Sequence, residues 1–328
     1  MKTAGFRGSS WGGLFVVAAS VLWGTTGTAA TFAPGVSPLA IGAVAMGLGG
    51  LLQAAIAAPR VIACSTSLRR QWRTVALGSV AVAAYPLAFY SSMHLAGVAV
   101  GTVVSIGSAP LASAVIERIV DKRRFTGRWA AGATLGLSGS MVLCCAEAAN
   151  SDPASASASG SSTPAGIGLG VVAGLTYALY SWAAHRLITT GVPSRAAMGA
   201  VFGAGGLFLM PVLALTGAPL FAAWQNLAVG AYMALVPMFA GYVLFGWGLA
   251  RVDASAATTI SLAETVVAAI LAVVIVGERL PALAWVGAGL VAGSLFVLTL
   301  PAPRQGNRSA EENAPNSSQP SHGVPTRA

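Results

Sequence analysis

The chain has 328 residues, of which 55% are hydrophobic and only 8% are charged, and its mean hydropathy is +0.75. A soluble domain carries about 25% charged residues because its surface faces water, so this composition excludes an ordinary soluble protein and predicts a surface that mostly faces lipid. The net charge of +9 is best explained by where the basic residues lie along the chain, and not by nucleic-acid binding.

Ten apolar segments follow one another along the chain, each long enough to cross a bilayer as a helix of roughly 20 residues. They are expected at residues 11–33, 36–58, 74–93, 98–118, 129–147, 166–184, 196–215, 225–249, 255–276 and 282–300. The strict apolar/polar alternation of membrane barrel strands is absent from them. The sequence therefore predicts an all-α integral membrane protein with about ten transmembrane helices.

The basic residues fall on one side of this predicted arrangement. With the N-terminus inside, Arg279 is the only one of the 18 Lys and Arg residues on the outer side. Such a bias predicts a multi-pass membrane protein with both termini in the cytoplasm. The same basic fringe is expected to contact anionic membrane lipid.

The chain divides into two similar halves. At a shift of 155 residues, Gly132 and Ala133 fall on Gly287 and Ala288, and similar matches recur along five segments. Because five is odd, the second half enters the membrane from the opposite side, which predicts two inverted five-helix repeats. The expected organisation is a cytoplasmic N-terminus (1–10), a first repeat (11–149), an extracytoplasmic linker (150–165), a second repeat (166–300) and a disordered cytoplasmic tail (301–328).

Four short motifs resemble a known family. They are Leu22-Trp23-Gly24, Ser37-Pro38-Leu39, Leu262-Ala263-Glu264 and Val276-Gly277-Glu278-Arg279-Leu280. In this order and spacing they resemble the EamA-like transporters of the drug/metabolite transporter superfamily, over about residues 11–300. The resemblance implies a secondary transporter of the cell inner (plasma) membrane that exports amino acids or related amphipathic compounds, with one EamA-like repeat in each half. We expect the two halves to rock around a midplane site.

Two carboxylates stand out within the predicted spans. Glu264 lies near the middle of the ninth segment, where a charge costs about 2.5–3.5 kcal/mol on insertion scales. It is either a carboxylate that binds substrate or a proton, or a glutamate that is hydrogen-bonded to a neighbouring helix and serves packing. Glu117, near the inner end of the fourth segment, is either a coupling or gating residue or an interfacial charge paired within a turn.

The resemblance also implies a central cavity among the first, third, fourth, sixth, eighth and ninth segments. Several of their side chains supply aromatic surface and hydroxyl groups suited to a partly apolar metabolite, although some rings are expected to face lipid instead. The candidates for substrate binding are Trp23, Tyr85, Tyr90, Ser105, Tyr177, Tyr180, Tyr242, Thr259 and Glu264. Neither a catalytic residue nor a metal ligand set is predicted.

Other functions fit the sequence less well. A nucleotide-sugar carrier of the same superfamily is the main alternative, but its phosphates need buried Lys or Arg. An intramembrane serine protease is suggested by Gly136-Leu137-Ser138-Gly139, but no His occupies a mid-membrane position. No ATP-binding motif or cofactor site is evident. Small residues at Gly132/Gly136 and Gly289/Gly293 suit internal packing or a homodimer interface, and both interpretations remain open.

Overall fold

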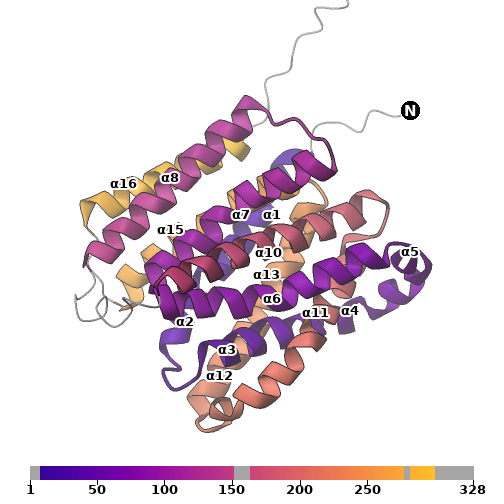
Figure 1. Cartoon of the computed structure of the whole chain (residues 1–328), viewed down its shortest axis with the longest axis horizontal. Coiled ribbons are helices and arrows are strands. Elements are labelled where there is room, and N and C mark those ends of the chain that lie inside the picture. Colours follow the sequence, from indigo (N-terminus) through magenta and orange to yellow (C-terminus); the bar gives the residue numbers. More distant parts are fainter. Residues whose placement is uncertain (1–7, 151–162, 277–280, 300–328) are drawn as a thin grey trace, which may run out of the picture.

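The computed structural model describes residues 8–150, 163–276 and 281–299, and the elements in these ranges are helices. In chain order they are α1 (Gly8–Gly24), α2 (Thr26–Thr31), α3 (Pro38–Gly42), η1 (Ala43–Leu48), α4 (Gly49–Ala63), α5 (Ser65–Arg70), α6 (Trp72–Ala96), α7 (Val98–Val120), α8 (Gly127–Asn150), α10 (Thr163–Thr189), α11 (Ser194–Thr216), η2 (Ala218–Phe221), α12 (Trp224–Met233), η3 (Ala234–Ala240), α13 (Gly241–Leu249), α14 (Ala254–Ile260), α15 (Ala263–Leu271), η4 (Ala272–Val276) and α16 (Ala282–Thr299). Figure 1 shows them as a bundle of long helices that cross the molecule in roughly the same direction.

These helices form the membrane spans that the sequence predicts. Among the described residues, nine are long and apolar enough to cross a membrane. The fifth predicted span, at residues 129–147, corresponds to α8, whose 24 residues are long enough to cross a membrane. The predicted all-helical membrane fold of about ten spans is therefore confirmed.

Particular residues explain where some spans begin and where their helical pitch changes. The second span begins at Ser37, whose hydroxyl accepts a hydrogen bond from the Ala40 amide at 3.2 Å, with Pro38 at the first helical position. Wider π turns occur in η1, η3 and η4, and η3 contains Pro237, which has no amide proton for a regular helical hydrogen bond. The second, eighth and ninth spans are consequently bent.

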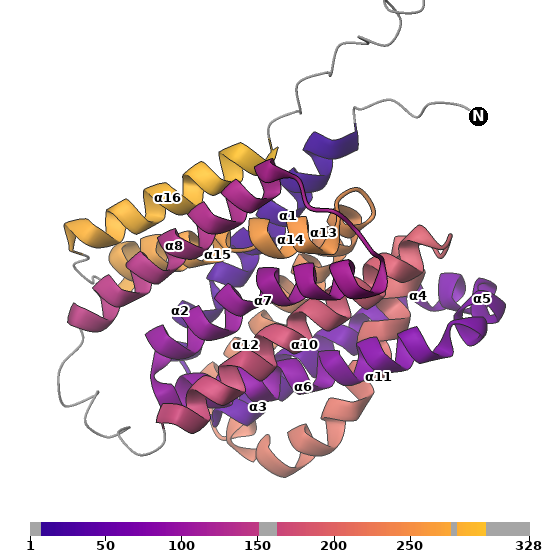
Figure 2. The same cartoon turned by 45° about the horizontal axis from the view of Figure 1, so that its top comes forward.

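The helices pair according to the inverted repeat. The α6–α10 pair joins the third span to the sixth, and its counterpart, α1–α13, joins the first span to the eighth. Equivalent spans also pair with each other, as α4 with α11 and α8 with α16. Figures 1 and 2 both show α8 and α16 lying side by side along one flank of the bundle. The main packing contacts thus join one half of the sequence to the other.

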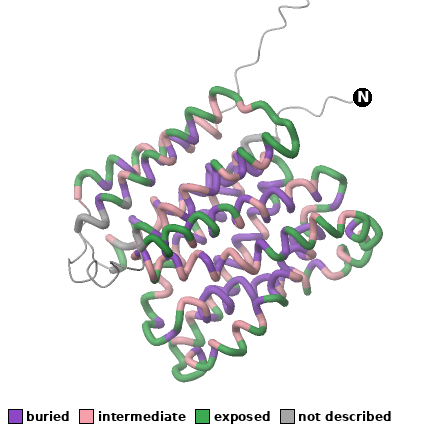
Figure 3. Tube along the Cα trace, viewed as in Figure 1, coloured by how far each residue is buried: buried purple, intermediate pink, exposed green. Residues whose placement is uncertain are grey.

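The core lies where these pairs meet, and apolar side chains also cover the outside. Figure 3 shows buried residues along the inner faces of the helices and exposed residues on the outer faces and at the junctions. Large apolar side chains on the outer faces include Leu207, Phe208 and Val274, whose exposed fractions are 61%, 53% and 74%. Exposure of this kind is expected of helices that face lipid.

The junctions α4–α6, α7–α8, α10–α11 and α13–α14 lie at one end of the bundle. The contacts that join them include Gln71 to Thr190 at 3.0 Å, Arg186 to Asp121 at 2.6 Å, and an ion pair between Arg123 and Asp253. We call this the basic end, because its junctions carry Arg60, Arg69, Arg70, Arg73, Arg118, Lys122, Arg123, Arg124, Arg128, Arg186, Arg195 and Arg251. The expected linker and tail, and Glu278 and Arg279, lie mostly or wholly outside the described residues.

Candidate functional site

A cavity lies between the spans, in the half of the bundle away from the basic end. Its volume is only about 30 Å³, room for about one water molecule and well below the roughly 300–1,000 Å³ of small-molecule sites, so a ligand enters only when the spans move apart. Its lining comes from α1, α2, α3, η1, α6, α10, η3, α13 and α15, and consists of Trp23, Thr26, Gly42, Ala45, Met46, Tyr85, Pro86, Phe89, Tyr90, Tyr177, Met238, Tyr242 and Glu264.

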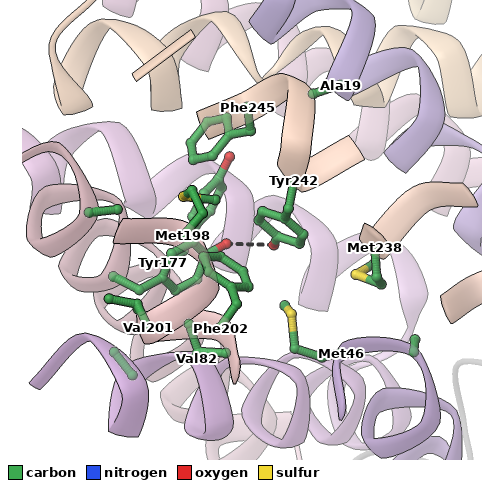
Figure 4. Close-up of a cluster of buried hydrophobic side chains, with 14 of the residues drawn as sticks. Ala19, Met46, Val82, Tyr177, Met198, Val201, Phe202, Met238, Tyr242 and Phe245 are labelled. Carbon is green, nitrogen blue, oxygen red and sulfur yellow. Dashed lines mark hydrogen bonds between the residues drawn. The ribbon is translucent and has the colours of Figure 1, made fainter. Parts of the chain in front are cut away.

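Aromatic rings form the wall of the cavity nearest to the basic end. The Trp23 ring lies 4.8 Å from that of Tyr242 and 6.3 Å from that of Tyr177, and Tyr177 lies 5.5 Å from Tyr85. Figure 4 shows Tyr177 and Tyr242 in this cluster, with Met238 drawn on the far side of Tyr242. Since aromatic pairs at these spacings hold one another in place, the wall is well ordered.

Hydrogen bonds fix the orientation of two of these rings. The Trp23 indole donates to the carbonyl of Pro237 at 3.0 Å, inside the π segment of the eighth span. The Tyr180 and Tyr242 hydroxyls are 2.7 Å apart and share a hydrogen bond, drawn as a dashed line in Figure 4. The eighth span therefore holds the Trp23 ring of α1 in place at the cavity through the Pro237 carbonyl.

Glu264 lies where the ninth span is interrupted. The regular helix stops at Ile260, and α15 begins again at Ala263, so that Glu264 occupies its first turn. Acidic residues are favourable at a helix N-terminus. The Glu264 carboxylate lines the cavity, and within the described part of the chain it accepts no hydrogen bond from another side chain. Its position is therefore not explained by packing through a hydrogen bond to a neighbouring helix.

A glycine of the first span allows α1 to lie close to α15 beside Glu264. A Cβ at Gly24 would lie 2.6 Å from Cβ of Val267 and 2.9 Å from the Glu264 carbonyl. Since real Cβ contacts are longer than this, α1 and α15 approach closely only because residue 24 has no side chain. The Leu22-Trp23-Gly24 motif thus supplies both a cavity ring and the small residue that lets Glu264 lie next to it.

Six of the nine predicted substrate-binding residues line this cavity. They are Trp23, Tyr85, Tyr90, Tyr177, Tyr242 and Glu264. Tyr180, Ser105 and Thr259 do not line it: each is fully buried, and the Thr259 hydroxyl donates to the Ser255 carbonyl at 2.7 Å. Their proposed roles in binding remain predictions.

The second span contributes residues that the sequence did not single out for the cavity. Gly42, Ala45 and Met46 line it, whereas among the described residues none from α7 does so, although the fourth span was expected to contribute. The π turn of η1, which contains Ala45 and Met46, rotates the following residues relative to a regular helix. Such a local change in helical pitch gives no periodic signal in the sequence.

Glu117 closes the basic end by joining the fourth span to the ninth. It is 2% exposed, and its carboxylate accepts hydrogen bonds from the amide of Ser255 at 3.0 Å and from its hydroxyl at 2.7 Å. It thereby satisfies an amide in the first turn of α14. The expected alternative, an interfacial charge paired with a neighbouring Arg or Lys, does not describe this arrangement, because Glu117 is bonded to a serine on another span.

Other polar contacts surround Glu117 at the basic end. The ion pair between Arg123 and Asp253 joins the α7–α8 junction to the start of α14, and His185 Nδ1 lies 2.7 Å from the Leu249 carbonyl. Asp121 accepts hydrogen bonds from Trp182 at 2.7 Å and from Arg186 at 2.6 Å. Together these contacts tie α7, α10, α13 and α14 to one another.

The remaining predicted features lie away from the cavity. Ser138 is exposed on α8, and its hydroxyl donates to the Thr134 carbonyl. Gly132 and Gly136 pack inside the protein, since a Cβ at either would lie 2.7 Å from a leucine side chain. Gly289 and Gly293 have open space beside them among the described residues. The described part of the chain also contains no cluster of three or more His, Cys, Asp or Glu that could hold a metal ion.

Comparison with known proteins agrees with this fold. The model of the EamA-like transporter family matches residues 10–145 and 164–300, one match in each half. A relative in Bacillus subtilis (strain 168), the uncharacterized transporter YwfM, is 33% identical over 293 residues, which cover 89% of this chain and 94% of the relative. A protein of known crystal structure has a TM-score of 0.69 and 21% identity, with 87% of this chain and 95% of that one covered, a likeness that concerns the fold alone.

Proposed function

The chain belongs to the EamA-like transporter family, and from this premise we propose that it is a secondary transporter that exports small metabolites, namely amino acids or related amphipathic compounds, across the plasma membrane by alternating access. We assign both termini and the basic end to the cytoplasm, because basic residues beside membrane spans are retained on that side. The observation that carries the proposal is a cavity between the spans that is lined by Glu264, together with a hydrogen bond between Glu117 and Ser255 that joins two spans at the basic end.

Two groups of spans meet around this cavity. The α6 group consists of α6, α7 and α10, which pack against one another. The α1 group consists of α1, η3–α13 and α14–α15, and it is the counterpart of the α6 group under the inverted repeat. Tyr85 and Tyr177 face the cavity from the first group, and Trp23 and Glu264 face it from the second.

The contacts at the basic end join one group to the other. Glu117 of the α6 group bonds to Ser255 of the α1 group, and His185 bonds to the Leu249 carbonyl. We expect these contacts to break when the cavity opens to the cytoplasm and to re-form when it opens outward. The moving units are then these two groups and not the two halves of the sequence, because the main helix pairs cross between the halves.

Glu264 is the residue we assign to coupling. A charge within the membrane has a high cost unless it is neutralised, and the carboxylate lacks a hydrogen-bond donor among the described side chains. Either a proton or a bound substrate can neutralise it. Exchange between the two would link substrate export to proton entry, with no need for ATP.

The lining also bears on the alternative cargo. A nucleotide sugar carries phosphate groups, which need Lys or Arg in the binding site. None of the described residues that line the cavity is basic. This composition favours a metabolite without phosphate.

The test is flux measured in proteoliposomes with purified full-length protein. Uptake and efflux of labelled amino acids and amphipathic compounds are compared with and without a pH gradient, for the wild type and for Glu264→Gln. We expect flux that depends on the gradient in the wild type and loses that dependence in the variant. Equal, gradient-dependent flux in both proteins would rule out Glu264 as the coupling residue, and the absence of flux for every compound would contradict the cargo class.

A further inference from the structure

The charge of the cavity lining indicates which charge the cargo carries. Among the described residues that line the cavity, Glu264 is the only charged one, and none is a Lys, Arg or His. The described Lys and Arg residues belong to the basic end. A negative group without a positive partner in a low-dielectric site attracts a cation and repels an anion.

The hydrogen-bond donors of the lining are mostly in use. The Trp23 indole and the Thr26 hydroxyl each donate to a backbone carbonyl, at 3.0 and 2.7 Å. The Tyr177 hydroxyl donates to a serine at 2.8 Å, and the Tyr242 hydroxyl is bonded to another tyrosine at 2.7 Å. A bound carboxylate or phosphate would need several free donors, and the cavity offers few.

The rings provide a surface that suits a cation. Trp23, Tyr85 and Tyr177 lie in a continuous chain of ring contacts, with centroids 6.3 and 5.5 Å apart. The face of an aromatic ring attracts an ammonium group, most strongly where water is excluded. Met46 and Met238 add a flexible apolar surface on the remaining side, which suits the hydrocarbon part of a ligand.

We propose that the cavity, when the spans around it move apart, binds a monocationic organic amine, with the ammonium group between the Glu264 carboxylate and the rings of Trp23, Tyr85 and Tyr177. The apolar part of the amine lies against Met46 and its neighbours. This inference deepens the proposed transport function and rests on it. It also makes a distinction within the proposed cargo, since an amino acid carries a second, negative group for which the lining has no cation.

The experiment compares matched ligands that differ in charge. Binding to the purified full-length protein in lipid nanodiscs is measured by calorimetry with 2-phenylethylamine, L-phenylalanine, 3-phenylpropionate and 2-phenylethanol. Tryptamine and L-tryptophan, and pentylamine and L-norleucine, form two further pairs. We expect each amine that binds to do so at least about tenfold more tightly than its amino acid, the factor that one charge-assisted hydrogen bond supplies.

Variants identify the group responsible for this preference. Glu264→Gln should remove the preference for the amine, whereas Glu264→Asp should retain part of it. Asp121→Asn is the matched control, because Asp121 bonds to Trp182 and Arg186 at the basic end and does not line the cavity. It should bind as the wild type does. Size-exclusion chromatography establishes whether each variant is folded.

The outcomes separate this inference from the transport proposal. Amino acids or 3-phenylpropionate binding as tightly as the amines, or no amine binding at all, would overturn the inference, even if flux of amino acids were observed. Retention of the preference in folded Glu264→Gln would also overturn it. Selective binding of amines without any flux in proteoliposomes would instead leave the binding site standing and refute transport.

Discussion

At the scale of single residues, Gly24 connects the first span to the carboxylate. We predict that Gly24→Ala destabilises the protein by about 1–3 kcal/mol, the usual cost of overpacking, because the new Cβ would meet Val267 and the Glu264 carbonyl at 2.6 and 2.9 Å. The loss is measured by thermal unfolding in detergent, with amine binding as a second readout.

Gly27 offers a matched control for this substitution. It also lies in the first span, but a Cβ there would have nothing within 4 Å among the described residues. Gly27→Ala should therefore leave unfolding and binding close to those of the wild type. If both variants behaved alike, close packing at Gly24 would not be what positions Glu264.

Individual residues show what the sequence could and could not predict about the site. Glu264 was identifiable because a lone carboxylate in an apolar span has a high energetic cost. Tyr180 and Tyr177 are only three positions apart on one helix, yet only Tyr177 lines the cavity. A span that is apolar on all sides carries no periodic signal to tell the cavity face from other buried faces, so the sequence could not separate the two.

At the scale of elements, α14 depends on a side chain from another span. We predict that Glu117→Ala loosens the inner end of the ninth span, because the amide of Ser255 then loses its acceptor. The readout is labelling of Thr259→Cys by a membrane-impermeant thiol reagent from the basic end, in a protein whose three native cysteines are replaced by Ala. Labelling should become about tenfold faster.

The conservative variant shows whether the hydrogen bond is responsible. Glu117→Gln keeps an acceptor oxygen for the Ser255 amide and should increase labelling less than Glu117→Ala does. Labelling that is unchanged by either substitution would mean that the contact between Glu117 and Ser255 does not hold the basic end closed.

The spans themselves were largely predictable, and their interruptions were not. Ten apolar segments of the required length are visible in the sequence, since the bilayer fixes the length of a span. The break before Ala263 and the π turns of η1 leave no comparable trace. Pro237 is the exception, because a proline inside a helix signals a bend directly.

At the scale of the whole molecule, each half of the sequence buries its apolar surface mainly against the other half. The pairs α6–α10, α4–α11, α8–α16 and α1–α13 all join the first half to the second. The repeats are therefore similar in sequence without being independently packed units. In this inverted repeat, α4–α11 and α8–α16 pair a helix with its own symmetry-related copy, and α6–α10 and α1–α13 pair it with the copy of another helix.

We therefore predict that the halves stay together after the chain is cut between them. A site for a specific protease is inserted between Ser155 and Ala156 of the expected linker, and the purified protein is cleaved and passed over a size-exclusion column in detergent. The two fragments should co-elute and retain the binding of the uncut protein, because the contacts that join α4 to α11 and α6 to α10 do not depend on the linker. Cleaved protein that is first denatured should separate, which shows that cleavage is complete. Separation without denaturation would mean that the cross-half contacts are weak, and the two halves would again be the natural moving bodies.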